Sequence, residues 1–436
     1  MSTLASPLVP SDADHASRAA PTTRESDSRF AVAGALGFFV ALNITFAVAN
    51  FNLSSLMTPI KHDLAILDAQ FGRIEACHAV SALLGLLFFG YLGNRLRLKS
   101  LIVAGVVVFS LATVSAGLAG GFFTFLLAYA LQAFGGGVIR GLVPVWLGDL
   151  VSPKWRMLIF GIFNGSYKIG TSISAYFGAW LAETHGWRAT LWWSGLPGLA
   201  ILLAFFFLRE PTRGQSEGLK PQALQRQTLR DSMRLLRLPN YLLHLAGLAA
   251  FSGGTIGLVW VASHFQRAFG ITNREASAVV GFALLCGVPA GFLGGFLGSW
   301  LLRHHRHGYG LLLSVGTLVA AAGFFFSFQA HELASAKLFL TVAICSFGAC
   351  TGATTTVTLE IVPIPLRLSA VAVAGVVQAT LGTALASEMI GILSDRFGLA
   401  RAILLVPALF LAASSAWTLL SLRQWRSEGV ASGSSQ

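Results

Sequence analysis

Apolar runs of about 20 residues recur along almost the whole chain, and short polar turns separate them. A helix needs about 20 apolar residues to cross a hydrocarbon core ~30 Å thick, because lipid offers no partner for free backbone groups. The pattern therefore predicts an all-α integral membrane protein with twelve transmembrane helices and both termini on one side. The predicted helices lie near 31–57, 70–92, 100–118, 122–147, 157–181, 189–208, 241–265, 277–299, 309–328, 337–359, 369–393 and 402–422.

Composition supports a membrane protein and excludes several other classes. Only 11% of the residues are charged and 55% are hydrophobic, whereas soluble domains carry about 25% charged residues. The four cysteines all lie in apolar runs without paired spacing, so they indicate neither a disulfide framework nor a metal site. Residues 1–28 lack the features of a signal peptide, and we expect a disordered cytoplasmic tail there.

The distribution of basic residues predicts the orientation in the membrane. Of the 30 Lys and Arg residues, twenty fall on the side of the N-terminus, eight on the opposite side and two inside predicted helices. Cytoplasmic loops carry the excess of Lys and Arg in membrane proteins. We therefore expect an inner (plasma) membrane protein with both termini in the cytoplasm.

Three sets of residues recur at a nearly constant offset, which indicates an internal duplication. The matching positions are Gly90 to Gly93 with Gly295 to Gly298, Asp149 and Arg156 with Glu360 and Arg367, and Glu183 and Gly186 with Asp395 and Gly398. The repeat predicts two six-helix halves, 29–208 and 241–422, a cytoplasmic linker at 209–240 and a cytoplasmic tail at 423–436. Duplicated halves around a central site are typical of secondary transporters.

The sequence GYLGNRLRLK at 90–99 resembles the signature turn of the major facilitator superfamily, usually Gly-x-Leu-Ala-Asp-Arg-x-Gly-Arg-Lys. Asn94 replaces the usual Asp, and Arg97 replaces a Gly. The segments 208–214 and 390–395, together with Trp260, resemble the Spinster-like branch of that family. The resemblance covers nearly the whole chain past residue 30, and it implies the twelve-helix fold and alternating access by a rocking motion.

The resemblance also implies a gate at the cytoplasmic end that closes in the outward-facing state. Its candidate residues are Gly90, Asn94, Arg95, Lys99, Asp149, Arg156, Glu360 and Arg367. Charges of both signs can form a cluster that one conformation assembles and the other breaks. Because Asn94 lacks a charge, we expect a weaker gate than in relatives. The alternative is that these residues only orient and cap helices.

Two cations lie inside predicted helices, where ionisable residues are costly and most often functional. Arg140 precedes Asp149 by nine residues and Lys168 follows Arg156 by twelve. At about 1.5 Å per residue, these spacings place the cations about 13 and 18 Å from the cytoplasmic turn, near the middle of the membrane. Two cations facing one cavity would attract an anionic substrate. The alternative is that one or both extend to the membrane surface or pair with a carboxylate.

Other polar residues inside the apolar runs are candidates for binding or for proton coupling. Glu75 and His78 share one helical face and can relay a proton, although Glu75 can equally be a carboxylate at a helix start. Glu388 is a further proton-coupling candidate. His244 and Trp260 are candidate substrate contacts, with a hydrogen bond inside the helix bundle as the alternative for His244.

The resemblance removes one expectation about coupling. Spinster-like chains usually carry Asp-Arg late in the first helix and an Arg with a Glu in the fourth, whereas this chain has Ala49-Asn50, Tyr129 and Gly136 there. The family's usual proton-coupling groups are therefore absent. Coupling, if present, would depend on Glu388 or Glu75.

Together these patterns predict a secondary active transporter of a small organic anion or anionic amphiphile, with or without proton coupling. The alternatives are an uncoupled facilitator, a lipid or drug exporter with aromatic-rich walls, or a receptor with a transporter fold. No nucleotide-binding motif or catalytic triad is present, so we expect neither an enzyme nor a cofactor. The histidine-rich turn at 304–307 favours orientation charge over a metal site. We expect a monomer with membrane lipids around it and no nucleic acid partner.

Overall fold

Long helices make up the regular structure of the computed structural model, which describes residues 22–93, 95–151, 153–208, 210–211, 235–304, 308–363 and 366–433. The prediction of an all-α fold is confirmed within these ranges. The first half contains α1 (Thr22–Leu64), α2 (Asp68–Gly93), α3 (Leu98–Gly117), α4 (Phe122–Leu150), α5 (Pro153–Ile173), the π-helical turn η2 (Ser174–Gly178) and α6 (Ala179–Phe205). The second half contains α8 (Pro239–Ile256), α9 (Leu258–Phe269), α10 (Asn273–His304), α11 (Gly308–Gln329), α12 (Leu333–Glu360), α13 (Arg367–Val377), the π-helical turn η4 (Gln378–Ala384), α14 (Leu385–Phe397), α15 (Leu399–Ala402) and α16 (Leu405–Gly433).

Among the described residues, nine helices are long and apolar enough to cross a membrane. The bent pair α8 and α9, which meet at 42°, makes a tenth if the two are one span. The remaining two predicted spans lie in the stretch from α5 to α6, where the chain turns at Gly186. With α6 divided there, the elements follow one another as the twelve predicted helices.

The internal repeat extends to backbone detail. Gly186 has φ 84° and ψ 161°, and its counterpart Gly398 has φ 82° and ψ 151°. Only glycine adopts such angles without strain, so both turns depend on it. A π-helical turn also precedes each glycine, η2 in the first half and η4 in the second. Insertions of this kind are frequent at functional sites, and both lie near the interface between the halves.

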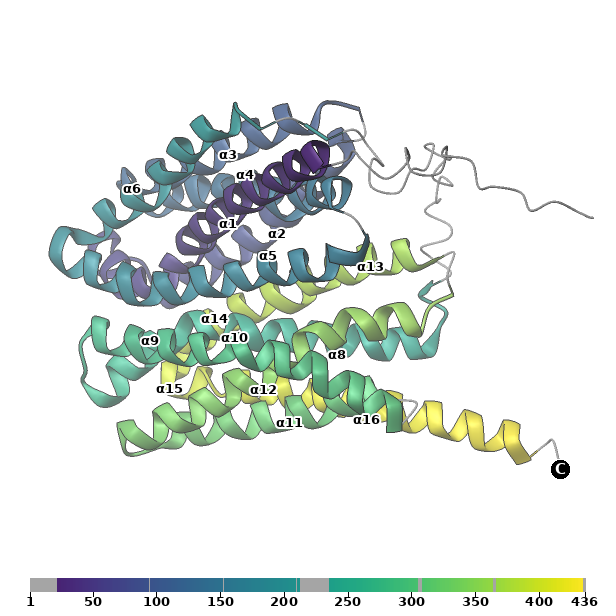
Figure 1. The fold of residues 1–436 in the computed structure, drawn as a ribbon. Helices are drawn as coiled ribbons and strands as arrows, with labels where there is room; N and C mark the ends of the chain where they lie inside the picture. The colour runs from purple at the N-terminus through teal and green to yellow at the C-terminus, as the bar shows by residue number, and fades with distance from the viewer. Residues whose placement is uncertain are drawn as a thin grey trace, which may run out of the picture.

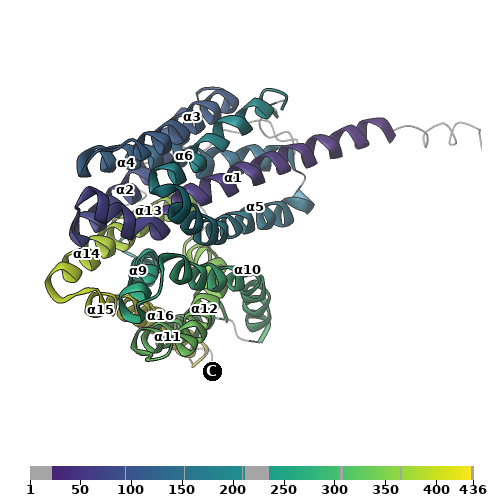
Figure 2. The ribbon, with the colours of Figure 1, turned by 90° about the vertical axis from the view of Figure 1, so that its left-hand side faces the viewer.

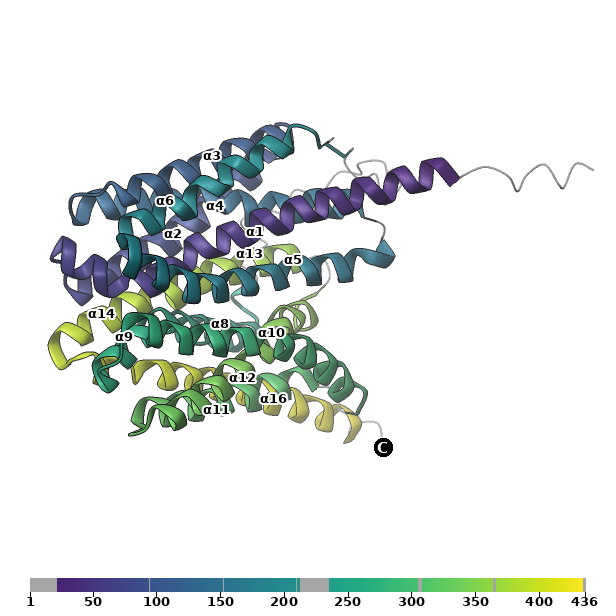
Figure 3. The ribbon, with the colours of Figure 1, turned by 60° about the vertical axis from the view of Figure 1, so that its left-hand side comes forward.

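The helices form two bundles, α1 to α6 and α8 to α16, whose long axes run in broadly the same direction (Figures 1, 2 and 3). The start of α1 and the end of α16 lie at one end of the molecule (Figure 1). We call this the proximal end and the opposite one, where α2 begins and α14 ends, the distal end. The bundles contact each other mainly through α2 against α14 and α5 against α10.

The signature turn at the proximal end joins helix ends of the first half. Lys99 Nζ donates hydrogen bonds to the carbonyl oxygens of Phe206 and Leu208, at 3.0 and 2.7 Å, where α6 ends. Glu210 accepts a 2.8 Å bond from the backbone N–H of Leu98, the first residue of α3. A cation at a helix C-terminus and a carboxylate at an N-terminus both favour the helix dipole. These contacts agree with the capping alternative for Lys99.

The other candidate gate residues are placed as follows. Arg95 lies with its guanidinium carbon 4.5 Å from the ring centroid of Tyr91. Asn94 and the side chain of Arg156 lie outside the described residues, as do most of the predicted linker and tails. Asp149 and Glu360 each have an interaction partner, and Arg367 begins α13 beside the end of α12. The charge cluster and the domain limits stay predictions.

Candidate substrate site

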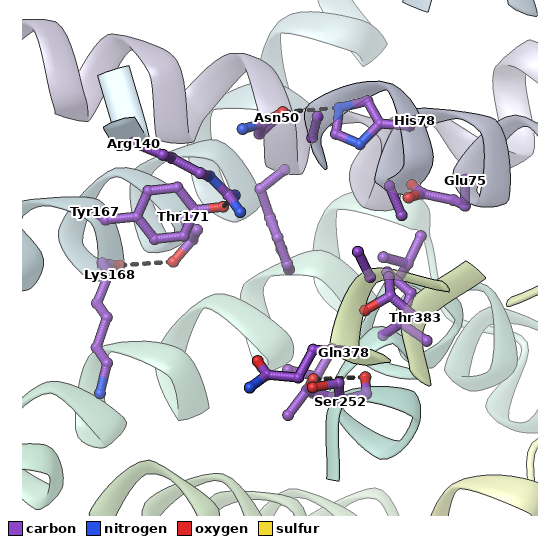
Figure 4. Close-up of a pocket in the computed structure, with 18 of the residues that line it drawn as sticks. Asn50, Glu75, His78, Arg140, Tyr167, Lys168, Thr171, Ser252, Gln378 and Thr383 are labelled. Atoms are coloured by element: carbon purple, nitrogen blue, oxygen red, sulfur yellow. Dashed lines mark hydrogen bonds between the residues drawn. The ribbon is translucent and has the colours of Figure 1, made fainter. Parts of the chain in front are cut away.

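A cavity of about 550 Å³ lies between the two bundles, and residues of both halves line it. Its size is typical of sites for small ligands. One part of the wall is apolar, with Phe51, Leu83, Leu86, Ile256, Leu284, Ile344 and Phe347. The polar lining residues include Asn50, Glu75, His78, Arg140, Tyr167, Lys168, Thr171, Ser252, Gln378 and Thr383 (Figure 4).

The structure places both intramembrane cations in this lining. Arg140 donates a 3.3 Å hydrogen bond from Nη2 to the hydroxyl of Tyr167, and its guanidinium carbon lies 5.5 Å from the ring centroids of Phe46 and Tyr167. Neither Arg140 nor Lys168 is in an ion pair with another described residue. Both cations therefore line one cavity, and their role in binding an anion stays a prediction.

Lys168 extends from the first half towards the second. A Cβ atom built on Gly291 of α10 would lie only 2.8 Å from its Nζ atom, so the ammonium group reaches the facing bundle. Figure 4 shows its side chain pointing away from Arg140. A ligand bound by both cations would therefore touch both halves of the protein.

His78 belongs to a hydrogen-bonded network on the same side of the cavity as Glu75. Its Nε2 atom lies 2.9 Å from Oδ1 of Asn50 and 3.1 Å from Oε1 of Gln132, so one N–H can be shared between two acceptors. The ring stacks on Tyr129 at 4.5 Å between centroids, and the Tyr129 hydroxyl donates to the carbonyl of Asn50 at 3.0 Å. Neutral groups thus occupy positions where we expected Spinster-like chains to carry charges.

The two candidate substrate contacts of the seventh span lie apart from the cavity lining. His244 is fully buried in the second half, where its Nε2 lies 2.8 Å from Oγ1 of Thr358 and its Nδ1 accepts a 3.1 Å bond from Trp417. This is the arrangement that we gave as its alternative. Trp260 is also fully buried and packs edge-on against Phe71 at 5.2 Å. Both side chains are held by packing within the protein.

Two carboxylates join the halves at the distal end in matching ways. Asp395, at the end of α14, accepts hydrogen bonds from the backbone N–H groups of Asp68 and Ala69 at 3.0 and 2.8 Å, where α2 begins. Glu183, its counterpart in the repeat, accepts a 3.0 Å bond from the backbone N–H of Arg274 near the start of α10. A negative charge there satisfies free N–H groups and favours the helix dipole.

Side-chain pairs strengthen the same contact. Asp68 accepts bonds from Arg267 at 3.0 and 3.2 Å and from the hydroxyl of Ser394 at 2.6 Å, and it also pairs with Lys61. Arg73 and Glu388 form a further ion pair between the halves at 2.9 Å. Glu388 therefore lies in a distal contact and outside the cavity lining. Seven of the residues in these contacts form what we call the distal latch: Asp68, Arg73, Glu183, Arg267, Arg274, Glu388 and Asp395.

Glycines let the two helices of the distal latch approach closely. A Cβ atom on Gly72 of α2 would lie 2.5 Å from the carbonyl oxygen of Ser387, and one on Gly391 of α14 would lie 2.5 Å from the carbonyl oxygen of Asp68. Such distances are far below van der Waals contact. The closed distal end therefore requires both positions to lack a side chain, as small-residue faces of membrane helices do.

The two bundles, the central cavity and the latch at one end define a membrane transporter. The family model of the Major Facilitator Superfamily matches residues 37–387. The chain belongs to this family, and it is a transporter and not an enzyme.

The chain is similar in sequence to several known proteins at low identity. The chain is 23% identical to the cis,cis-muconate transport protein of Acinetobacter baylyi, over 61% of this chain and 65% of that protein. It is 26% identical to protein spinster homolog 1 of Xenopus tropicalis, over 81% of this chain and 71% of that protein. It is 24% identical to the sphingosine-1-phosphate transporter SPNS2 of the same species, over 83% of this chain and 73% of that protein.

Solved structures show the same fold. A bacterial homologue of the human lysosomal transporter Spinster, in an inward-facing and unoccupied conformation, superposes with a TM-score of 0.80 and 20% identity. That match covers 90% of this chain and 97% of the other. The same homologue in its occupied conformation gives a TM-score of 0.77 at 19% identity, over 92% of this chain and 98% of the other.

Proposed function

We propose that the protein is a secondary active transporter of a small organic anion or anionic amphiphile. The observation that carries this proposal is the pair of cavity cations, Arg140 and Lys168, without a carboxylate partner among the described residues. Cations held in a low-dielectric cavity bind an anionic group by charge-assisted hydrogen bonds. The apolar wall then contacts the rest of the substrate.

The names of two relatives support an anionic substrate. One is a transporter of cis,cis-muconate and another of sphingosine-1-phosphate, and both compounds carry an anionic group at neutral pH. They differ in their apolar part, so they make a useful pair of probes. A thermal stabilisation screen of the purified protein should include both, together with lysolipids and other organic acids.

Alternating access supplies the transport cycle in this proposal. The distal latch joins the halves at one end, so we propose that the cavity opens to the proximal side in this conformation. We propose that the proximal end is cytoplasmic, because most basic residues lie on that side. Opening would then require the latch to break and the proximal end to close. Each bundle would move largely as a unit.

We expect position 184 to be extracellular and position 216 to be cytoplasmic. Thr184 is exposed at the distal end, next to the turn at Gly186, whereas Ser216 lies in the predicted linker. A membrane-impermeant maleimide applied to intact cells should therefore label a cysteine at 184 and spare one at 216 until the cells are opened. Labelling of position 216 from outside would contradict the proposed orientation.

A receptor with a transporter fold is the second candidate from another class. Its cavity would bind the anion equally well, so binding alone does not separate the two functions. Flux into sealed proteoliposomes does, because a receptor binds without moving its ligand. An uncoupled facilitator would equilibrate the anion across the membrane, and only a coupled transporter would accumulate it against a gradient.

A further inference from the structure

Glu75 is the acidic residue among the described residues that line the cavity, and neither cation of that lining forms an ion pair with it. Its side chain is only 5% exposed. None of the hydrogen bonds or ion pairs between described residues involves its carboxyl group. By contrast, Asp68, Glu388 and Asp395 on the neighbouring helix ends are engaged in the distal latch.

The charged and titratable groups around Glu75 come from several elements. On its own helix the nearest is His78, whose ring is hydrogen-bonded to Asn50 and Gln132. From α4, Tyr129 and Arg140 face this side of the cavity, and α5 contributes Tyr167 and Lys168. The turn η4, which packs against α2, presents Gln378 and Thr383, which carry no charge. On α14, Glu388 is paired with Arg73.

An isolated carboxylate in such a position is costly, because burial removes its hydration and no partner replaces it. The protonated form avoids this cost. Glu75 follows Asp68 by seven residues, which places it about 10 Å along α2 from the start of the latch. Separation of α2 from α14 would bring water to this part of the helix. Hydration would then lower the free energy of the charged carboxylate.

We propose that Glu75 is a proton-binding site that couples proton uptake to closure of the distal end. The carboxylate takes up one proton when the distal end is open, and the resulting neutral carboxylic acid is buried when α2 and α14 close. The proton leaves once the site faces the proximal side. This inference rests on the proposed function for its substrate, but its conformational part does not depend on which substrate is bound.

Coupling to the anion follows from the shared cavity. A charged Glu75 would repel an anion held by Arg140 and Lys168, and protonation removes that repulsion. Proton and anion therefore bind with positive cooperativity, and by linkage each raises the affinity for the other. The outcome is proton–anion symport, with a carboxyl group on the second span in place of the groups that Spinster-like chains carry on the first and fourth.

The test measures the distal distance against pH without any substrate. Spin labels at position 118, after α3, and position 332, before α12, report opening of the distal end in a variant whose four native cysteines are replaced. Both side chains are exposed and lie on different halves. Between about pH 5.5 and pH 8.5, the ratio of closed to open protein should fall at least about tenfold, because closure takes up a proton.

Three variants make the result decisive. Glu75→Gln should stay closed with less than about a twofold response to pH, because it mimics the protonated acid. Glu75→Asp keeps the acid and should keep the response. Asp63→Asn, which breaks a carboxylate pair with Arg188 inside the first half, should also keep it. The proposal would be overturned if folded Glu75→Gln kept the full pH dependence of the closed-to-open ratio. It would also be overturned if the ratio in the parent protein did not depend on pH.

A latch variant separates failure of this inference from failure of alternating access. Asp395→Asn weakens the distal latch and should lengthen the distance at every pH, whatever the role of Glu75. One outcome is that Asp395→Asn opens the distal end while the distal distance in the parent protein does not change with pH. In that case Glu75 is not the proton site, but alternating access is still supported. If no variant opens the distal end at any pH, both the inference and the proposed transport cycle are wrong.

Discussion

Loss of both cavity cations should abolish anion binding while leaving the protein folded. In the double variant Arg140→Ala/Lys168→Ala, the anionic group would lie in a low-dielectric cavity without compensation. Each single substitution should weaken binding more than about tenfold, or ~1.5 kcal/mol, which is typical of a lost hydrogen bond to a charged group. Titration calorimetry with cis,cis-muconate, sphingosine-1-phosphate or a stronger hit from the stabilisation screen measures the affinity.

Two controls separate charge from position. Lys337→Ala removes a positive charge from an exposed site at the distal start of α12 and should leave the affinity unchanged. Lys168→Arg retains the charge but replaces a compact ammonium with a planar group. Because Nζ already lies against Gly291, we expect reduced affinity in that variant as well. Near-normal affinity in the folded double variant would mean that the substrate is neutral or cationic.

Gly391→Ala should open the distal end. The new methyl group would lie 2.5 Å from the carbonyl oxygen of Asp68, so α14 must move away from α2 and stretch the bonds of the latch. We expect the closed-to-open ratio to fall at least about tenfold, which corresponds to ~1.4 kcal/mol. The same spin labels at positions 118 and 332 should report a longer mean distance.

Gly295→Ala is the matched control for this experiment. Gly295 also lies in a long helix that passes the interface region, but a Cβ atom there meets no atom within 4 Å. Its distance distribution should equal that of the parent protein. If the distal end of the Gly391→Ala variant stayed closed, α2 and α14 would accommodate the methyl group without separating. The claim that their close approach requires glycine at position 391 would then be wrong.

The helices were predictable because lipid permits few alternatives. A run of apolar residues in a membrane must form a helix, so the predicted span 70–92 corresponds closely to α2, Asp68–Gly93. The connection between the fifth and sixth spans was harder to predict from the sequence. The chain there stays helical through η2 into α6, and a single glycine with positive φ makes the turn.

The distal latch was not predicted, although its signal was present in the repeat. Glu183 and Asp395 matched at a constant offset, yet a carboxylate near a helix end also serves as an ordinary cap. Its partner cannot be known without the topology, since Asp68 and Arg267 are 199 residues apart in the chain. The same limit applied to Glu388, whose partner Arg73 belongs to the other half.

Intramembrane polar residues were recognised, but their direction was not. An apolar helix shows little difference between its faces, so rotation about its axis is set by packing. Arg140 and Lys168 turn to the cavity, whereas His244 turns into the second half and bonds Thr358 and Trp417. The smaller polar groups of the lining, such as Gln378 and Thr383, carry no charge and gave no signal.

Flux of the best-stabilising anion into sealed proteoliposomes tests the central claim most directly. The account predicts saturable uptake by the parent protein, accumulation above equilibrium when the outer solution is more acidic, and no uptake by the Arg140→Ala/Lys168→Ala variant. Binding of the anion without uptake would contradict the account and identify a receptor. Undiminished uptake by the double variant would equally show that the anion does not travel through this site.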